Sequence, residues 1–181
     1  QQVAMGGGVS AAIKTDGTLW IWGTNGNGVP GQNQTTGSSR SSPTQVGTET
    51  TWAKIQLLST AYAYGIAATK TDGTRWAWGR NAEGSLGLNE GGYAPYYSSP
   101  VQVGTNTDWH TTNWVGAYGA DIAVQAMKTD GTLWVWGENS YGTLGQNDRT
   151  NHSSPIQVSG TWTWWNKGST TAFFVGSKEK E

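Results

Sequence analysis

The amino-acid sequence predicts an all-β protein built from repeated small sheets, and three recurring features support this prediction. The phrase KTDGTLWIWG at residues 14–23 returns with few changes at 70–79 and 128–137. A second phrase, Ser-Ser-Pro-x-Gln-Val, begins at residues 41, 98 and 153. A tryptophan follows each second phrase, at Trp52, Trp109 and then either Trp162 or Trp164. Because all three features share a spacing of roughly 56 residues, the chain is a tandem repeat.

Each copy of the first phrase has the pattern of a β-hairpin. Short runs of β-forming residues flank an Asp-Gly dipeptide, which indicates a two-residue turn whose central residues need positive φ. The predicted turn residues are Asp16, Gly17, Asp72, Gly73, Asp130 and Gly131. The strand after each turn is apolar on both faces, as expected for a sheet that lies between two other sheets.

The repeated tryptophans are predicted to form the core of the repeat. Aromatic rings also stack on sugars, so a carbohydrate platform is the alternative. Their recurrence in frame, within strands and beside a hairpin turn, favours the core. The predicted core tryptophans are Trp20, Trp22, Trp76, Trp78, Trp134, Trp136, Trp52 and Trp109.

The remainder of each unit predicts two further elements. A loop rich in Gly and Asn follows the hairpin at 22–33, 78–89 and 136–147. The Ser-Ser-Pro phrase then predicts a short strand, with proline at its entry, where no ladder donor is lost. About four short strands in about 56 residues form a unit of the size of a β-propeller blade, and no segment shows helical periodicity.

The number of units does not complete a ring. The units are approximately 1–51, 52–108 and 109–160, followed by a half-unit at 161–181. Propellers have about 4–8 blades, so the ring is not closed by this chain alone. The chain is a piece of a longer ring, or neighbouring chains finish its half-units, or something else caps an open arc. Since an uncovered end would expose an apolar sheet face, we expect other protein chains to cover the ends.

The segment KTDGTLWVWGENSYGTLGQN…SSPIQV at 128–158 resembles the repeat of the regulator-of-chromosome-condensation family. The resemblance extends over essentially the whole chain, and its wording is closest to the bacterial and bacteriophage members. It implies a β-propeller fold. It also implies a binding or structural role, with nucleotide exchange on a small GTPase or inhibition of a secreted enzyme as less favoured roles.

Composition argues against several classes of function. Charged residues make up 13% of the chain and the net charge is −1, so there is no basic patch for nucleic acid. No run approaches the ~20 apolar residues of a membrane span. The absence of cysteine excludes disulfides and thiolate chemistry.

No catalytic set is visible in the sequence. The two histidines, His110 and His152, are not in a metal-ligand pattern, and the proximity of Asp108 to His110 is more typical of a surface hydrogen bond. We therefore predict a protein that is not an enzyme, with no metal and no cofactor.

Departures from the repeat are the candidate binding residues. The loop at 89–97 contains tyrosines, which contact partners at low entropic cost, or else fold back onto their own loop. Arg75 replaces a leucine of the sister repeats, so we expect it to reach solvent, a carboxylate or an interface. The candidates are Tyr93, Tyr96, Tyr97, Trp114, Tyr118, Trp165 and Arg75.

The favoured function is a non-enzymatic component of a larger assembly, such as a decoration, fibre or tail protein of a bacteriophage virion. The alternative is a carbohydrate-binding module for host-surface glycans. The expected location is a virion or the extracellular surface, with the cytoplasm as the alternative.

Overall fold

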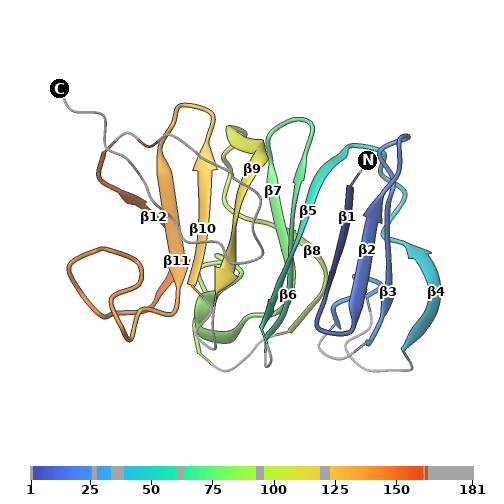
Figure 1. Cartoon of the computed structure of the whole chain (residues 1–181), viewed down its shortest axis with the longest axis horizontal. Helices are drawn as coiled ribbons and strands as arrows, with labels where there is room; N and C mark the ends of the chain where they lie inside the picture. The colour runs from blue at the N-terminus through green and yellow to red at the C-terminus, as the bar shows by residue number, and fades with distance from the viewer. Residues whose placement is uncertain are drawn as a thin grey trace.

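The computed structural model describes residues 2–25, 28–33, 39–60, 63–92, 96–118, 123–160 and 162. These residues form three antiparallel sheets of four strands each and no α-helix. Figure 1 shows the sheets side by side in chain order, with the first and the third at opposite ends of the row. The predicted all-β fold of blades that do not close into a ring is confirmed.

Each sheet is a simple meander in which consecutive strands pair. The first sheet holds β1 (Gln2–Gly6), β2 (Val9–Ile13), β3 (Leu19–Gly23) and β4 (Arg40–Gln45). The second holds β5 (Trp52–Thr60), β6 (Ala63–Lys70), β7 (Arg75–Arg80) and β8 (Tyr96–Gln102), with a short 3-10 turn η2 (Ala82–Gly84). The third holds β9 (Trp109–Tyr118), β10 (Ala123–Lys128), β11 (Leu133–Gly137) and β12 (His152–Val158).

The Asp-Gly pairs lie in the hairpin turns, but the expected two-residue turn is wrong in detail. In the first hairpin Lys14 N donates to Thr18 O and Gly17 N donates to Lys14 O, so the turn spans more residues. Only Gly17 of the pair has a positive φ, of 77°. The longer turn brings Gly17 against the backbone carbonyl of Thr50, where a Cβ atom would clash.

Alternating residues of each middle strand serve two different interfaces. On β7, Trp78 packs with the first sheet while Ala77 packs with the third. One core therefore lies between the first and second sheets, with Leu19 and Ile21 of β3 against Trp78. An equivalent core lies between the second and third sheets. The second sheet is buried on both faces, as its two-sided apolar pattern predicts.

Candidate interaction surfaces

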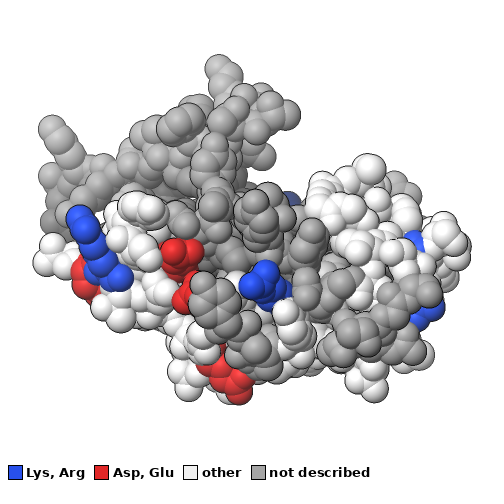
Figure 2. Space-filling view, turned by 90° about the horizontal axis from the view of Figure 1, so that it is seen from below, with Lys and Arg blue, Asp and Glu red and all other residues white. Residues whose placement is uncertain are grey.

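Three loops lie along one edge of the row of sheets. They join β3 to β4, β7 to β8 and β11 to β12, and they appear at the bottom of Figure 1. Figure 2 shows the molecule from this side, where the described residues present separate groups of Lys or Arg and of Asp or Glu among other side chains.

A buried asparagine fixes two of these loops from inside. The Asn81 side chain accepts from Leu86 N at 3.0 Å and donates to Glu90 O at 2.8 Å. Asn139 repeats this arrangement, accepting from Leu144 N at 2.9 Å and donating to Asp148 O at 3.0 Å. Both asparagines are fully buried. The loops therefore present their outer residues from a rigid internal support.

Two described tyrosines of the predicted binding loop have different environments. Tyr96 is 43% exposed, whereas Tyr97 is half-buried and packs against both cores. The Tyr97 hydroxyl donates to Glu90 Oε2 at 2.5 Å. Burial, aided by this carboxylate, raises the pKa of Tyr97 to about 12. Tyr97 is therefore the tyrosine that folds back onto its own loop, and Tyr96 is the one available for contact.

Tyr141, 78% exposed in the third loop, is a surface residue that the repeat pattern does not single out. The rest of its loop matches the other copies of the repeat, so a comparison of the three loops as whole segments does not single out Tyr141. A comparison of single positions would have identified Tyr141 as a departure from the repeat, since Glu83 occupies the equivalent position in the second loop. Tyr141 and Tyr96 are the exposed aromatic residues of the described part of the chain.

Several predicted binding residues have no described side chain. Tyr93 and Trp165 lie outside the described residues. Trp114 and Tyr118 belong to β9, whose backbone is described at these positions while their side chains are not.

Arg75 lies within the molecule, at the interface between the second and third sheets. It is 2% exposed, and its guanidinium lies 4.8 Å from the ring centroid of Trp136 and 5.8 Å from that of Trp109. Burial lowers the pKa of Arg75 to about 9, so it remains a cation at neutral pH. The aromatic faces supply the cation–π attraction that partly offsets its desolvation.

The opposite edge carries a repeated polar chain that links each hairpin turn to its tryptophan. In the first sheet Trp20 Nε1 donates to Thr18 Oγ1 at 2.8 Å, and Thr18 Oγ1 donates to Asp16 Oδ1 at 2.6 Å. Hydrogen bonds from the side chain and the backbone N–H of Thr18 lower the pKa of Asp16. The same chain recurs at residues 72, 74 and 76 and at residues 130, 132 and 134. The repeated aspartates thus act as turn and cap residues.

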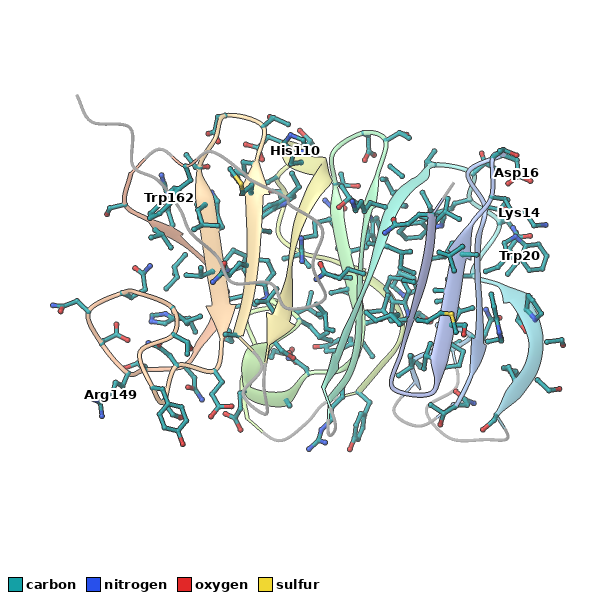
Figure 3. All side chains as sticks on the ribbon, in the orientation of Figure 1. Lys14, Asp16, Trp20, His110, Arg149 and Trp162 are labelled. Carbon is teal, nitrogen blue, oxygen red and sulfur yellow. The ribbon has the colours of Figure 1, made fainter. Side chains whose placement is uncertain are left out.

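Lysines of the same phrase cover the outer tryptophans. Lys14 Nζ lies 3.9 Å from the ring centroid of Trp20, and Figure 3 shows both at the outer side of the first sheet. Lys70 lies equally close to Trp76 and forms an ion pair with Glu49 at 2.8 Å. These cations occupy the ring faces that a sugar would need, which favours the core role over a platform.

The remaining titratable groups do not gather. Asp108 forms an ion pair with Lys128 at 3.2 Å, and Asp148 lies 3.5 Å from His152. Across the described ranges no three His, Asp or Glu side chains lie close enough together to hold a metal ion. No helix there is both long and apolar enough to cross a bilayer.

The outer face of the first sheet is a second exposed surface. Val3 is 67% exposed and Met5 is 78% exposed, beside the half-buried Trp20 and Trp22. Their register counterparts in the second sheet are Ile55, Leu57, Trp76 and Trp78, which pack against the first sheet. The first sheet therefore exposes a face that its neighbour buries.

Comparison with known proteins gives matches to one repeat family. A model of the Regulator of chromosome condensation (RCC1) repeat matches residues 130–164, and a second RCC1 repeat model matches residues 1–29. The Arabidopsis thaliana RCC1 domain-containing protein RUG3, mitochondrial, is 28% identical over 158 residues, which cover 86% of this chain and 34% of that protein.

Two solved structures share the fold. Prp20p from Saccharomyces cerevisiae superposes with a TM-score of 0.70 at 17% identity, covering 89% of this chain and 38% of Prp20p. Yeast RCC1 (Prp20) bound to Kap60 superposes with a TM-score of 0.69 at 16% identity, covering 89% of this chain and 37% of that one. The chain thus spans about a third of the length of these proteins. Both the repeat models and the fold agree with the predicted family, so the resemblance of the chain to the RCC1-type repeat family is confirmed, with propeller blades that it does not close into a ring by itself.

Proposed function

We propose that this chain is a non-enzymatic protein-binding module whose contact surface is the loop edge. The observation that carries the proposal is the contrast between rigid, repeated supports and differing outer residues. The loop edge is the side of the molecule formed by the three loops. Asn81 and Asn139 hold the second and third loops in the same way, yet Tyr96 is exposed at the end of the second loop and Tyr141 is exposed in the third. Tyrosine on a rigid, weakly charged surface suits protein recognition.

The relatives support a protein partner as the class of ligand. The yeast protein Prp20p is described with its binding to Gsp1p and histones, and also in complex with Kap60. The low identity limits this likeness to the fold, so the partner of this chain is proposed from its own loops.

A photo-crosslinker tests the loop edge. p-Benzoylphenylalanine at position 141, in the organism that encodes the chain, should give a crosslinked band of discrete mass that digestion with a protease removes. The same group at Thr105, on the opposite edge, is the matched control and should give none. The added substitution Tyr96→Ser should weaken the band from position 141. Equal crosslinking from both positions would contradict the proposal.

The glycan alternative receives less support. A lectin with repeated sites would expose aromatic residues at equivalent positions of several sheets. Among described residues, Tyr96 and Tyr141 are the exposed aromatic side chains, and they occupy different positions of the repeat. Binding of the chain to a glycan array, lost on Tyr141→Ser, would favour the lectin role.

We also propose that the module works in a larger assembly, in which other chains cover its end sheets, and that this assembly is a virion or an extracellular structure. The exposed Val3 and Met5 support the first part. The second part rests on the expectation from the sequence that the repeats resemble bacterial and bacteriophage members. Mass spectrometry of gradient-purified particles from the source tests the location, because a virion protein must copurify at a fixed ratio to the capsid protein.

A further inference from the structure

The two junctions between sheets use the same hydrogen bond. Trp78 Nε1 of the second sheet donates to Val29 O, in the loop of the first sheet, at 2.9 Å. Trp136 Nε1 of the third sheet donates to Ser85 O, in the loop of the second sheet, also at 2.9 Å. Each acceptor stands four residues after the first Asn of its loop, at position 25 or 81. At both junctions, therefore, a tryptophan of one sheet binds a backbone carbonyl of the preceding sheet.

Glycines make room for that tryptophan. A Cβ atom at Gly31 would lie 3.0 Å from Trp78 Nε1, and one at Gly87 would lie 2.9 Å from Trp136 Nε1. Both glycines have a positive φ, 67° and 74° respectively. The loop is thus shaped to receive an indole ring directly above its backbone.

The Ser-Ser-Pro strand completes each junction. Gly28 faces Ser98 and Gly84 faces Ser153, with Cβ positions 2.8 Å and 2.6 Å from the serine Cα atoms. The serine carbonyls accept from Asn33 N and Asn89 N, each at 2.8 Å. The receiving half of a junction is therefore a nine-residue loop, and the inserting half is a tryptophan with a Ser-Ser-Pro strand.

Among the described residues, nothing inserts into the third loop, residues 139–147, which otherwise has the form of a receiving half. It has the same glycines at the same spacing, at positions 142 and 145. Within the described part of the chain, a Cβ atom at Gly145 would meet nothing within 4 Å, and one at Gly142 would meet only Asp148 O at 3.8 Å. Thr143, the counterpart of the buried Val29 and Ser85, is exposed, and no described donor reaches its carbonyl.

The first sheet has the form of an inserting half, and no receiving loop faces it among the residues that the structure describes. Trp22 is the counterpart of Trp78 and Trp136, and within the described residues its indole nitrogen has no acceptor. Ser41 is exposed, whereas Ser98 and Ser153 are half-buried in their junctions. Met5, which is in register with Trp22 on the same face with Ser10 of β2 between them, is also exposed. One chain thus carries both unmatched halves of one junction at opposite ends.

We propose that a second copy of this chain fills the open junction, head to tail. In this contact the Trp22 indole of one copy donates a hydrogen bond to the Thr143 carbonyl of the next copy. Ser41 of the first copy packs against Gly142 of the next. This inference rests on the proposed function, in which other chains cover the end sheets, and it identifies the covering chain as a second copy. Because the two contact surfaces differ, the contact is heterologous and builds a ring or a filament of copies rather than a twofold dimer.

Sedimentation velocity and native mass spectrometry of the full chain over a concentration series provide the test. The wild-type chain should form species larger than its 19.3 kDa monomer. Met5→Glu and Thr143→Glu should each weaken association at least ~100-fold, because a carboxylate would be buried unpaired in the contact. Thr105→Glu is the matched control and should associate like the wild type. Met5, Thr143 and Thr105 are all exposed, so the substitutions leave the monomer fold intact.

Mixing the two blocked variants separates this proposal from any other self-association. The Met5→Glu chain keeps its receiving loop and the Thr143→Glu chain keeps its inserting sheet, so a 1:1 mixture should form a dimer and nothing larger. A wild-type chain that stays monomeric, or a mixture that does not pair, overturns the head-to-tail contact. Position 141 lies in the same receiving loop, so the mass of the crosslinked product separates the two proposals: a product of two copies of this chain reports the head-to-tail contact, and a product with another protein reports the loop-edge function.

Discussion

Trp136 Nε1 donates a 2.9 Å hydrogen bond to the carbonyl oxygen of Ser85, which lies 51 residues earlier in the chain. The bond crosses from the third sheet to the loop of the second, and both partners are buried. An identical bond joins Trp78 to Val29. What repeats along this chain is therefore the junction between neighbouring sheets as well as the sheet itself.

Trp136→Phe should lower the free energy of unfolding by about 2–4 kcal/mol. It leaves the buried carbonyl of Ser85 without its donor, a loss of about 1–3 kcal/mol, and it removes part of a fully packed ring. Urea unfolding at low protein concentration measures the change. Trp22→Phe is the matched control, because its indole has no described acceptor, and it should cost less than about 1 kcal/mol. Equal losses for the two variants would contradict a role for the junction bond.

Gly87→Ala should destabilise the chain more than Gly145→Ala. Both positions have a left-handed backbone, with φ of 74° and 65°, and this costs an L residue about 1–2 kcal/mol at either site. Only at Gly87 would the added methyl group also lie 2.9 Å from an indole nitrogen, Trp136 Nε1. Thermal unfolding should therefore separate the two variants by a further ~1–3 kcal/mol. A larger loss at Gly145 would be incompatible with its open surroundings.

Arg75→Leu should leave stability unchanged or increase it. Leucine stands at this place in the sister repeats, and replacing a buried cation by a well-packed apolar residue is often neutral or stabilising by about 1–4 kcal/mol. Arg75→Ala should instead cost about 2–4 kcal/mol, because it leaves a cavity beside Trp109 and Trp136. Denaturant unfolding of both variants decides the matter, and a large loss in the leucine variant would show that the cation–π contacts dominate.

Acid should destabilise the hairpin turns. Hydrogen bonds from Thr74 lower the pKa of Asp72 below 3.8, as Thr18 and Thr132 do for Asp16 and Asp130. A folded pKa below the unfolded one gives stability that is present above about pH 4 and is lost as the pH falls through the folded pKa. The triple Asp→Asn variant should show a flatter dependence of the melting temperature between pH 5 and pH 2. If the melting temperature of the variant depended on pH as steeply as that of the wild type, other carboxylates would be responsible for the loss of stability in acid.

The repeat phrase predicts the hairpins and the tryptophan core of the second and third sheets. It is wrong for Trp20 and Trp22, which lie half-buried outside both cores because no described sheet packs on the outer face of the first sheet. Asp-Gly turns and two-sided apolar strands depend on neighbours in sequence, so the amino-acid pattern alone assigns Trp78 and Trp136 to a core. The predicted turn type is wrong, because the longer turn seen here and a two-residue turn share the same Asp-Gly dipeptide. The difference lies in the backbone hydrogen bond from Lys14 to Thr18, which residue identity does not reveal.

The candidate surfaces are less accessible to sequence reasoning. Tyr96 and Tyr97 are adjacent and chemically identical, yet only Tyr97 donates a hydrogen bond to Glu90 and packs against the cores. The sequence predicts Arg75 at solvent, a carboxylate or an interface, and only packing places it on the rings of Trp109 and Trp136. The repeat pattern does not single out Tyr141, since exposure is a property of the assembled loop edge.

The sequence by itself determined the repeat, the strands and the alternation that gives each strand two apolar faces, since these follow from local periodicity. Only the tertiary structure decided which carbonyl each tryptophan reaches. The acceptors are Val29 in one junction and Ser85 in the other, and every residue carries the same backbone oxygen. A hydrogen bond to the backbone leaves no mark on side-chain identity, so the junction became visible only when sheets about 50 residues apart in the chain lay side by side.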